Sequence, residues 1–195
     1  MDAIISLYIS LMPAILAGVA TSAFCKSGLI DSLRLPMDGG RTLRDGRRIF
    51  GEHKTWKGFF GYIVFNAALG VLWGRVCKSQ ALSARNLFYA LHENSTLFNL
   101  RIGILEGLAY ALFELPNSFM KRRLGIAPGK APDGFLRGFF IFLDQADSVF
   151  GCVLVLCLFY PLSAGMYILY VMLGALTHIV FNMLLYALGV RRNMF

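Results

Sequence analysis

Two aspartates, Asp144 and Asp147, stand three residues apart in "FLDQADSVFGCVL", at the head of a strongly apolar stretch. On a helix, residues with this spacing share one face, so the pair presents two carboxylates to one or two divalent cations. Mg2+ is the natural candidate, because it takes hard oxygen ligands and shares its coordination sphere with substrate phosphates and water. The alternative is that both carboxylates form structural ion pairs with arginines. We favour the metal, because two adjacent like charges within a bilayer are costly unless something strongly positive lies between them.

A basic segment, "LPNSFMKRRLGIAPGKAPDG", precedes the aspartates. If residues 117–124 are helical, Ser118, Lys121 and Arg122 lie on one face, with Asn117 beside them, and offer a hydroxyl and two cations to an anion. The Pro-Gly pair at 128 and 129, together with Lys130, then makes a flexible basic turn that leads toward the aspartates. The alternative is a juxtamembrane basic cluster that contacts acidic lipid headgroups. This segment alone does not decide between the two.

A third segment, "MDGGRTLRDGRRIFGEHKTWKGFFGY", is rich in both glycine and charge. Glycines let backbone N–H groups approach oxyanions, and arginines bind phosphate in a two-pronged way. The segment is not a P-loop, because no G-K-[ST] follows a strand. Retention of positive charge in the cytoplasm would explain the arginines, but not the aspartates and glycines among them. We therefore favour nucleotide or phosphate binding.

The composition is that of a membrane protein. Of 195 residues, 57% are hydrophobic and 15% are charged, and the mean hydropathy is +0.61, outside the range of ordinary soluble domains. The net charge of +8 is gathered in a few short segments, which indicates orientation and phosphate handling rather than a nucleic-acid surface. No nucleic-acid-binding pattern is present, and the cysteines show no metal-type spacing.

Long uncharged runs predict an all-α integral membrane protein of about five transmembrane helices in a single domain, 1–195, because a helix needs about 20 residues to cross the hydrocarbon. The predicted spans are 3–25, 57–75, 102–120, 138–160 and 164–190. We expect Pro116 to kink or end the third span. The uncharged part of the fourth span, 148–160, is too short to cross alone. The helix must therefore start near Gly138, which draws both aspartates into the membrane.

Basic residues predict the orientation of these spans. Residues 26–57 carry eight Lys or Arg and residues 121–137 carry five. The tail adds Arg191 and Arg192, whereas the opposite side has only Arg75, Lys78, Arg85 and Arg101. By the positive-inside rule the N-terminus is outside, while the C-terminus and the loops at about 26–56 and 121–137 are cytoplasmic. The expected location is the cell membrane, with the active site facing the cytoplasm.

At these residues the sequence resembles a known family. Ser118, Lys121 and Arg122, then Pro128-Gly129, then "DQAD" resemble the S-x-x-K-R, P-G-H-G-G and D-R-x-D signature of the phosphatidate cytidylyltransferase superfamily. The sequence departs from that signature at Lys130, in place of His, and at Gln145, in place of Arg. With the glycine-rich segment and "PNSFMKRRLGI", it is more similar to the CDP-archaeol synthase family, a compact five-span branch. The resemblance covers nearly the whole chain.

The resemblance implies that CTP and a lipid phosphate react, with Mg2+, to give a CDP-lipid and pyrophosphate. Asp144 and Asp147 would then hold Mg2+ against the triphosphate, and Lys121 and Arg122, with Ser118, would hold the phosphates or the lipid headgroup. The further candidates for substrate binding, mostly on the CTP side, are Asn117, Lys130, Arg41, Arg44, Arg47, Arg48, Lys54 and Lys57. The archaeol-type acceptor rests on resemblance alone, and phosphatidate stays a rival. A homo-oligomer is compatible with the sequence.

Other functions remain open from the residues alone. A transporter or flippase of a phosphorylated substrate could use the same cavity, but an odd number of spans without visible repeats argues against the usual transporter plan. A membrane prenyltransferase also uses aspartates with Mg2+, but such enzymes generally show two aspartate-rich motifs and only one lies within a span here. A non-catalytic scaffold gives no reason to bury the aspartate pair.

Several polar residues inside the spans have weaker assignments. For Asn66, His178 and Asn182 we expect hydrogen bonds between helices. Glu106 and Glu114 either face the cavity as counter-charges to the loops or pair structurally, and the sequence does not separate these roles.

Overall fold

The computed structural model describes residues 2–187 except 131 and 133, and it does not describe the side chain of residue 185. Five long helices account for most of this part of the chain, and three short 3-10 turns lie between them. The long helices are α1 (Asp2–Lys26), α2 (Trp56–Ser79), α3 (Thr96–Arg123), α4 (Leu136–Phe159) and α5 (Ala164–Ala187). Each is long and apolar enough to cross a membrane, so the prediction of five spans is confirmed.

The helix that carries the aspartate pair begins at Leu136, which confirms that residues before 148 belong to the fourth span. At about 1.5 Å per residue, Asp144 and Asp147 lie about 12 and 16 Å along its axis. The third span does not end at Pro116, because α3 continues to Arg123. One proline removes a single backbone hydrogen bond, and a helix packed among other helices tolerates this loss. As a result, Asn117, Lys121 and Arg122 stand on a continuous helix.

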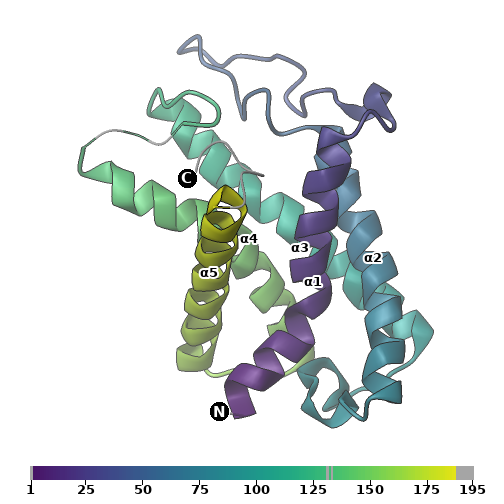
Figure 1. Cartoon of the computed structure of the whole chain (residues 1–195). Coiled ribbons are helices and arrows are strands. Elements are labelled where there is room, and N and C mark those ends of the chain that lie inside the picture. Colours follow the sequence, from purple (N-terminus) through teal and green to yellow (C-terminus); the bar gives the residue numbers. More distant parts are fainter. Residues whose placement is uncertain (1, 131, 133, 188–195) are drawn as a thin grey trace.

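The helices alternate in direction, so the connections gather at two opposite ends (Figure 1). The glycine-rich loop between α1 and α2 lies at the same end as the connection between α3 and α4. The N-terminus, the connection between α2 and α3 and the short turn between α4 and α5 lie at the other end. The two basic segments therefore share one end, as five spans require. The predicted basic tail at Arg191 and Arg192, and the predicted end of the fifth span at 188–190, lie outside the described residues.

Small residues bring α2 and α3 together. A Cβ atom on Gly103 would lie 2.5 Å from the Asn66 carbonyl oxygen, and one on Gly107 would lie 2.5 Å from the Tyr62 carbonyl oxygen. Only glycine allows this approach of two backbones, which is the usual packing of membrane helices. This glycine seam, the contact of α2 with α3 at Gly103 and Gly107, holds the middle of α3 in place. The C-terminal part of α3 carries the candidate site residues.

The expected polar contacts between helices are partly confirmed. Asn182 Nδ2 donates to Gln145 Oε1 at 2.6 Å and joins α5 to α4. For Asn66 the expectation is wrong among the described residues, because its buried side-chain amide has no hydrogen-bond partner there.

Candidate active site

The two aspartates on α4 converge on one amide of α3. Asn117 Nδ2 donates to Asp144 Oδ1 at 2.7 Å and to Asp147 Oδ2 at 2.8 Å. One turn later on α3, Lys121 Nζ donates to Asp144 Oδ1 at 2.6 Å. The helical spacing of 144 and 147 on α4 and of 117 and 121 on α3 places all four side chains at the interface of the two helices. The structure therefore brings together residues that the sequence proposed separately.

The two carboxylates differ in exposure. Asp147 is 7% exposed, and its other oxygen accepts from the Ser148 backbone N–H at 2.7 Å. The side chain of Asp144 is 35% exposed. The pair is therefore accessible from the Asp144 side. α4 starts at the end of the molecule that carries the basic loops (Figure 1), and Asp144 is the nearer of the two aspartates to that start.

Arg122 is a buried cation with unused donors. It is 7% exposed, and its Nε and Nη1 atoms have no hydrogen-bond partner among the described residues. The glycine-rich loop covers it, since a Cβ atom on Gly51 would lie 3.6 Å from Arg122 Nη1 and 3.3 Å from Pro128 Cγ. An enclosed guanidinium without an acceptor is costly, so the arrangement favours an anion at this position.

The glycine-rich loop is organised around Asp38. This carboxylate is buried and accepts from the Arg48 guanidinium and from the backbone N–H groups of Gly40 at 3.0 Å, Phe50 at 3.1 Å and Gly51 at 2.9 Å. Burial alone would raise the pKa of Asp38, but these donors outweigh it and hold the pKa well below its usual value. Asp38 is thus ionised at neutral pH and closes the loop on itself.

A second set of contacts fastens this loop to the end of α3. Arg123 Nη1 donates to both oxygens of Asp45 at 2.7 Å, and its Nη2 donates to the backbone carbonyls of Arg47 and Arg48. In return, the Arg47 side chain donates to the Arg123 carbonyl. Arg123, the next residue in the chain, therefore holds the glycine-rich loop over Arg122.

Lys54 connects the loop to the membrane helices. It pairs with Glu114 on α3, and the Tyr62 hydroxyl donates to the other oxygen of Glu114 at 3.3 Å. Burial lowers the pKa of Lys54, but the nearby carboxylates of Glu114, Asp147 and Asp144 outweigh burial and raise it, so Lys54 stays charged. The sequence left two roles open for Glu114. In the structure its carboxylate is the counter-charge of Lys54 in the loop.

The other predicted site residues form no hydrogen bond or ion pair with the two aspartates in the described part of the chain. Lys57 is buried, and its Nζ donates to the Ser27 carbonyl at 2.7 Å and to Asp31 Oδ1 at 3.1 Å, which fixes the start of the loop to α2. Ser118 is half-buried on α3. Three side chains, Arg41, Arg44 and Lys130, are exposed to solvent at the loop end of the molecule. Their contact with substrate stays a prediction.

Sequence reasoning missed three residues that shape the site: Asp38, Asp45 and Arg123. The available signal was the aspartates that alternate with arginines in "DGGRTLRDGRR", because acidic residues in a phosphate-binding loop need partners of their own. Asp38 pairs with Arg48 inside the loop, and Asp45 pairs with Arg123 across to α3.

The donor atoms at the carboxylate pair fit a hard divalent cation. Asp144 and Asp147 each bring one carboxylate oxygen to the same donor, Asn117 Nδ2, so the two oxygens lie close together, and the buried Oδ1 of Asn117 accepts no hydrogen bond from the described residues. No cluster of three or more His, Cys, Asp or Glu side chains suited to a metal occurs in the described part of the chain. Mg2+ needs no such cluster, because one or two carboxylates with substrate phosphates and water complete its coordination.

A family model described as CarS-like, CDP-archaeol synthase, matches residues 3–195. The chain belongs to the CDP-archaeol synthase family. A CDP-archaeol synthase of Methanococcus aeolicus is 31% identical over 190 residues, which cover 96% of this chain and 94% of the relative. A CDP-archaeol synthase of Methanoculleus marisnigri is 32% identical over 164 residues, which cover 80% of this chain and 87% of the relative.

A solved structure has the same fold. It is described as that of an intramembrane enzyme for archaeal membrane lipids biosynthesis, and it matches with a TM-score of 0.61 at 24% identity, over 90% of this chain and 92% of the other. Together with the five apolar helices, this likeness makes the chain a multi-pass membrane protein of the CDP-archaeol synthase fold. The predicted resemblance to this family is confirmed.

Proposed function

We propose that this protein transfers a cytidylyl group from CTP to an archaeol-type, ether-linked lipid phosphate, and so forms a CDP-lipid and pyrophosphate. The curated relatives are named CDP-archaeol synthase, which favours this acceptor over phosphatidate. The observation that carries the proposal is the group of Asp144, Asp147, Asn117 and Lys121, next to Arg122, whose Nε and Nη1 have no partner among the described residues, within membrane helices and beneath an arginine-rich loop.

The reaction needs positioning and charge compensation more than proton transfer. A phosphate monoester carries between one and two negative charges near pH 7, so an oxygen of the lipid phosphate attacks the α-phosphorus of CTP without a strong general base. A bond forms between this oxygen and the α-phosphorus, and the bond from the α-phosphorus to the bridging oxygen of the β-phosphate breaks. The electron pair leaves with pyrophosphate. The barrier lies in bringing two anions together and in the charge that grows on the leaving group.

The cations of this chain meet these needs. Arg122 has two donors beneath the loop without a partner in the described part of the chain, and with them it binds a phosphate of the triphosphate in the two-pronged way. Lys121 contacts Asp144 and lies where the two anions meet, so it offsets their repulsion. Arg47 and Arg48 are held by Arg123 and Asp38 at the rim of the site, where they attract CTP from the aqueous side.

Mg2+ would be held by Asp144 and Asp147, and when bound it would neutralise charge on the triphosphate and on the leaving pyrophosphate. Asn117 keeps the two carboxylates in register for this task, since its amide contacts both. Gly51 lies close to both Pro128 and Arg122, and this packing would limit access of water to a phosphate bound at Arg122.

The test is an assay of purified protein with labelled CTP, Mg2+ and an ether-linked lipid phosphate, scored for CDP-lipid and pyrophosphate. We expect product from the wild type and none when the divalent cation is chelated. The variants Asp144→Asn and Asp147→Asn should each abolish turnover while they leave the protein folded and inserted. Glu93→Gln, an exposed acid at the opposite end, is the matched control and should behave as wild type.

Three outcomes would count against the proposal. Absence of product with both ether-linked and ester-linked acceptors would remove the activity. Faster turnover with an ester-linked phosphatidate than with the ether-linked acceptor would remove the assigned substrate. Near-normal rates in either aspartate variant would remove that residue from the site.

A further inference from the structure

A third carboxylate, that of Glu114, lies near the aspartate pair. Glu114, Asn117 and Lys121 follow one another on α3 at spacings of three and four residues, so their side chains share one face of the helix. The other two members of this face contact Asp147 and Asp144 directly. The side chain of Glu114 is mostly buried. It therefore adds a further negative charge inside a membrane helix, where such a charge is costly.

The packing of α3 against α4 keeps Glu114 at this level. Gly151 lies one turn after Asp147 on α4, and a Cβ atom there would lie 2.9 Å from Phe113 Cδ2 of α3. Asn117, one turn further along α3, meets Asp147 itself. The stretch of α3 between these two contacts therefore lies against the turn of α4 that begins at Asp147, and Glu114 belongs to that stretch.

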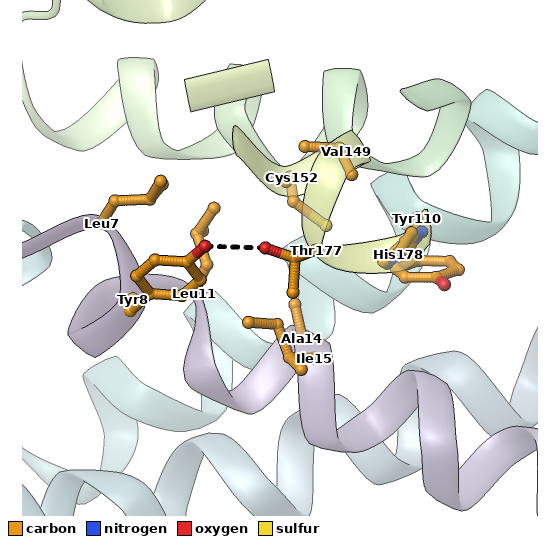
Figure 2. A pocket seen from close by; sticks show the side chains of 11 residues that line it. Leu7, Tyr8, Leu11, Ala14, Ile15, Tyr110, Val149, Cys152, Thr177 and His178 are labelled. Atoms are coloured by element: carbon orange, nitrogen blue, oxygen red, sulfur yellow. Dashed lines mark hydrogen bonds between the residues drawn. The ribbon is translucent and has the colours of Figure 1, made fainter. Parts of the chain in front are cut away.

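Both oxygens of Glu114 have partners. One pairs with Lys54 Nζ, and the other accepts from the Tyr62 hydroxyl at 3.3 Å. Tyr62 is supported in turn by Tyr110, with ring centroids 4.1 Å apart. Figure 2 shows Tyr110 beside His178 of α5, and these two rings have centroids 6.4 Å apart. Glu114 is therefore a fixed acceptor for the lysine, because its second oxygen is tied to rings packed between helices.

Lys54 has other carboxylates nearby. Its backbone is held just before α2, because its carbonyl accepts from the Met37 N–H at 2.8 Å. The charges of Asp147 and Asp144 act on its ammonium together with that of Glu114. Neither aspartate pairs with Lys54 in the described part of the chain. Lysine carries its charge on a flexible stem of four carbons, so the choice between these acceptors depends on Glu114.

We infer that Glu114 is a positioning residue, which holds Lys54 off the carboxylate pair and so keeps Asp147 open to a divalent cation. The inference rests on the proposed function, in which Asp144 and Asp147 hold that cation. An ammonium and a divalent cation need the same carboxylate oxygens, so a lysine paired with Asp147 would compete with the metal. Lys121 already contacts Asp144, and Asp147 is therefore the carboxylate that this arrangement protects.

The experiment is a titration of the purified full chain with Mn2+ alone, without CTP or lipid phosphate. Free Mn2+ is measured by electron paramagnetic resonance, and the binding that is lost in Asp147→Asn reports the carboxylate pair. We expect Glu114→Gln to raise the Kd of this binding by about 10-fold or more, the usual cost of losing a residue that orients metal ligands. Glu114→Asp keeps the charge and should retain most of the affinity.

The matched control is Glu106→Gln. Glu106 is also a buried acid on α3, about two turns before Glu114, and its Oε1 has no partner among the described residues. The same exchange of a carboxylate for an amide therefore disturbs no lysine. Glu106→Gln should bind Mn2+ as the wild type does, and a loss equal to that of Glu114→Gln would overturn the inference.

Removal of the lysine separates positioning from a simple effect of charge. Glu114→Gln removes a negative charge near the metal, and this alone would weaken Mn2+ binding whether Lys54 is present or not. If Glu114 acts through the lysine, Glu114→Gln in the Lys54→Met background changes the Kd by no more than about 2-fold. An equal loss of affinity in both backgrounds would overturn the inference. If Lys54→Met lowers the melting temperature, Lys54→Gln replaces it with the same expectation.

The readouts separate this inference from the proposed function, because the Mn2+ titration needs neither CTP nor acceptor. The expected Mn2+ pattern without any CDP-lipid in the assay would leave the positioning role standing and remove the reaction. CDP-lipid formation with wild-type Mn2+ binding in Glu114→Gln, or with no binding that depends on Asp147, would leave the reaction standing and remove the positioning role.

Discussion

At the scale of single residues, one amide decides the geometry of the site. Asn117 is the only described side chain that contacts both aspartates, and it does so with a single nitrogen atom. Two carboxylates close together repel each other, and a shared donor holds them in place before any ligand arrives. Lys121 contacts only the outer carboxylate, so it compensates charge but does not set the distance between the two.

We therefore predict that Asn117→Ala lowers kcat by about 10- to 100-fold, the usual cost of losing a residue that orients metal ligands. The KM for the lipid acceptor should change little, because the hydrogen bonds of the Asn117 side chain go to the two carboxylates. Steady-state kinetics with separate variation of CTP and acceptor measure both values. Asn94→Ala removes an amide with comparable hydrogen bonds at the opposite end, and it should affect the melting temperature without affecting kcat. Equal kinetic losses in the two variants would contradict a positioning role for Asn117.

At the scale of elements, the site depends on two rigid helices and on a loop held together by charge. The seam between α2 and α3 consists of backbone contacts across Gly103 and Gly107, and α3 in turn carries Asn117 and Lys121. The glycine-rich loop has little apolar burial of its own. It is held by Asp38 within the loop and by Arg123 from α3.

The first prediction at this scale concerns the seam. Gly103→Ala or Gly107→Ala should destabilise the protein by at least about 2 kcal/mol, because an added methyl group collides with backbone that cannot move aside. Thermal unfolding in detergent measures the effect. Gly138→Ala on α4 and Gly165→Ala on α5 are matched controls with nothing within 4 Å of the added atom, and alanine is the better helix former there. If the seam variants melted at the same temperature as the controls, the close α2–α3 contact would not stabilise the protein as we predict.

The second prediction concerns the loop and pH. Because the folded loop lowers the pKa of Asp38, ionised Asp38 stabilises the loop fully above its ordinary pKa of about 3.9. This stability is lost as the pH falls below that value toward the lowered one. Hydrogen exchange of residues 38–51, corrected for the intrinsic rate, should show constant protection from pH 7 to about pH 5 and a decline below about pH 4.

Asp38→Asn provides the comparison. Asp45 has a pKa lowered by the Arg47 backbone N–H and by Arg123, so it contributes with the same sign. The variant should therefore show weaker protection at pH 7 and a shallower, but not flat, acid dependence. An acid dependence as steep as that of the wild type would exclude Asp38 as its main source.

At the scale of the whole molecule, five crossings place both basic segments at one end (Figure 1). The site lies toward that end, since α3 ends there just after Lys121 and α4 starts there before Asp144. By the positive-inside rule we expect this end to face the cytoplasm.

The orientation predicts which positions are accessible from outside the cell. In a background without the four native cysteines, Glu93→Cys should react with a membrane-impermeant maleimide on intact cells, whereas Glu52→Cys should react only after lysis. Both positions are exposed glutamates in connections at opposite ends, so they differ only in side. The reverse pattern would invert the orientation and place the site outside.

The sequence by itself determined the number of crossings, their approximate bounds and the residue types of the site. Hydrophobicity over about 20 residues is a local property, and the i, i+3 spacing of Asp144 and Asp147 follows from one helix alone. The continuation of α3 past Pro116 was not predictable in this way, because neighbouring helices decide whether a proline ends a helix. Only the tertiary structure decided that Asn117 holds both aspartates, that Lys54 pairs with Glu114 and Arg123 with Asp45. The partners in these pairs are 27 to 78 residues apart in the chain. Which residues pair at such separations depends on how the helices pack and on where the loop lies against them, and no local sequence pattern encodes this.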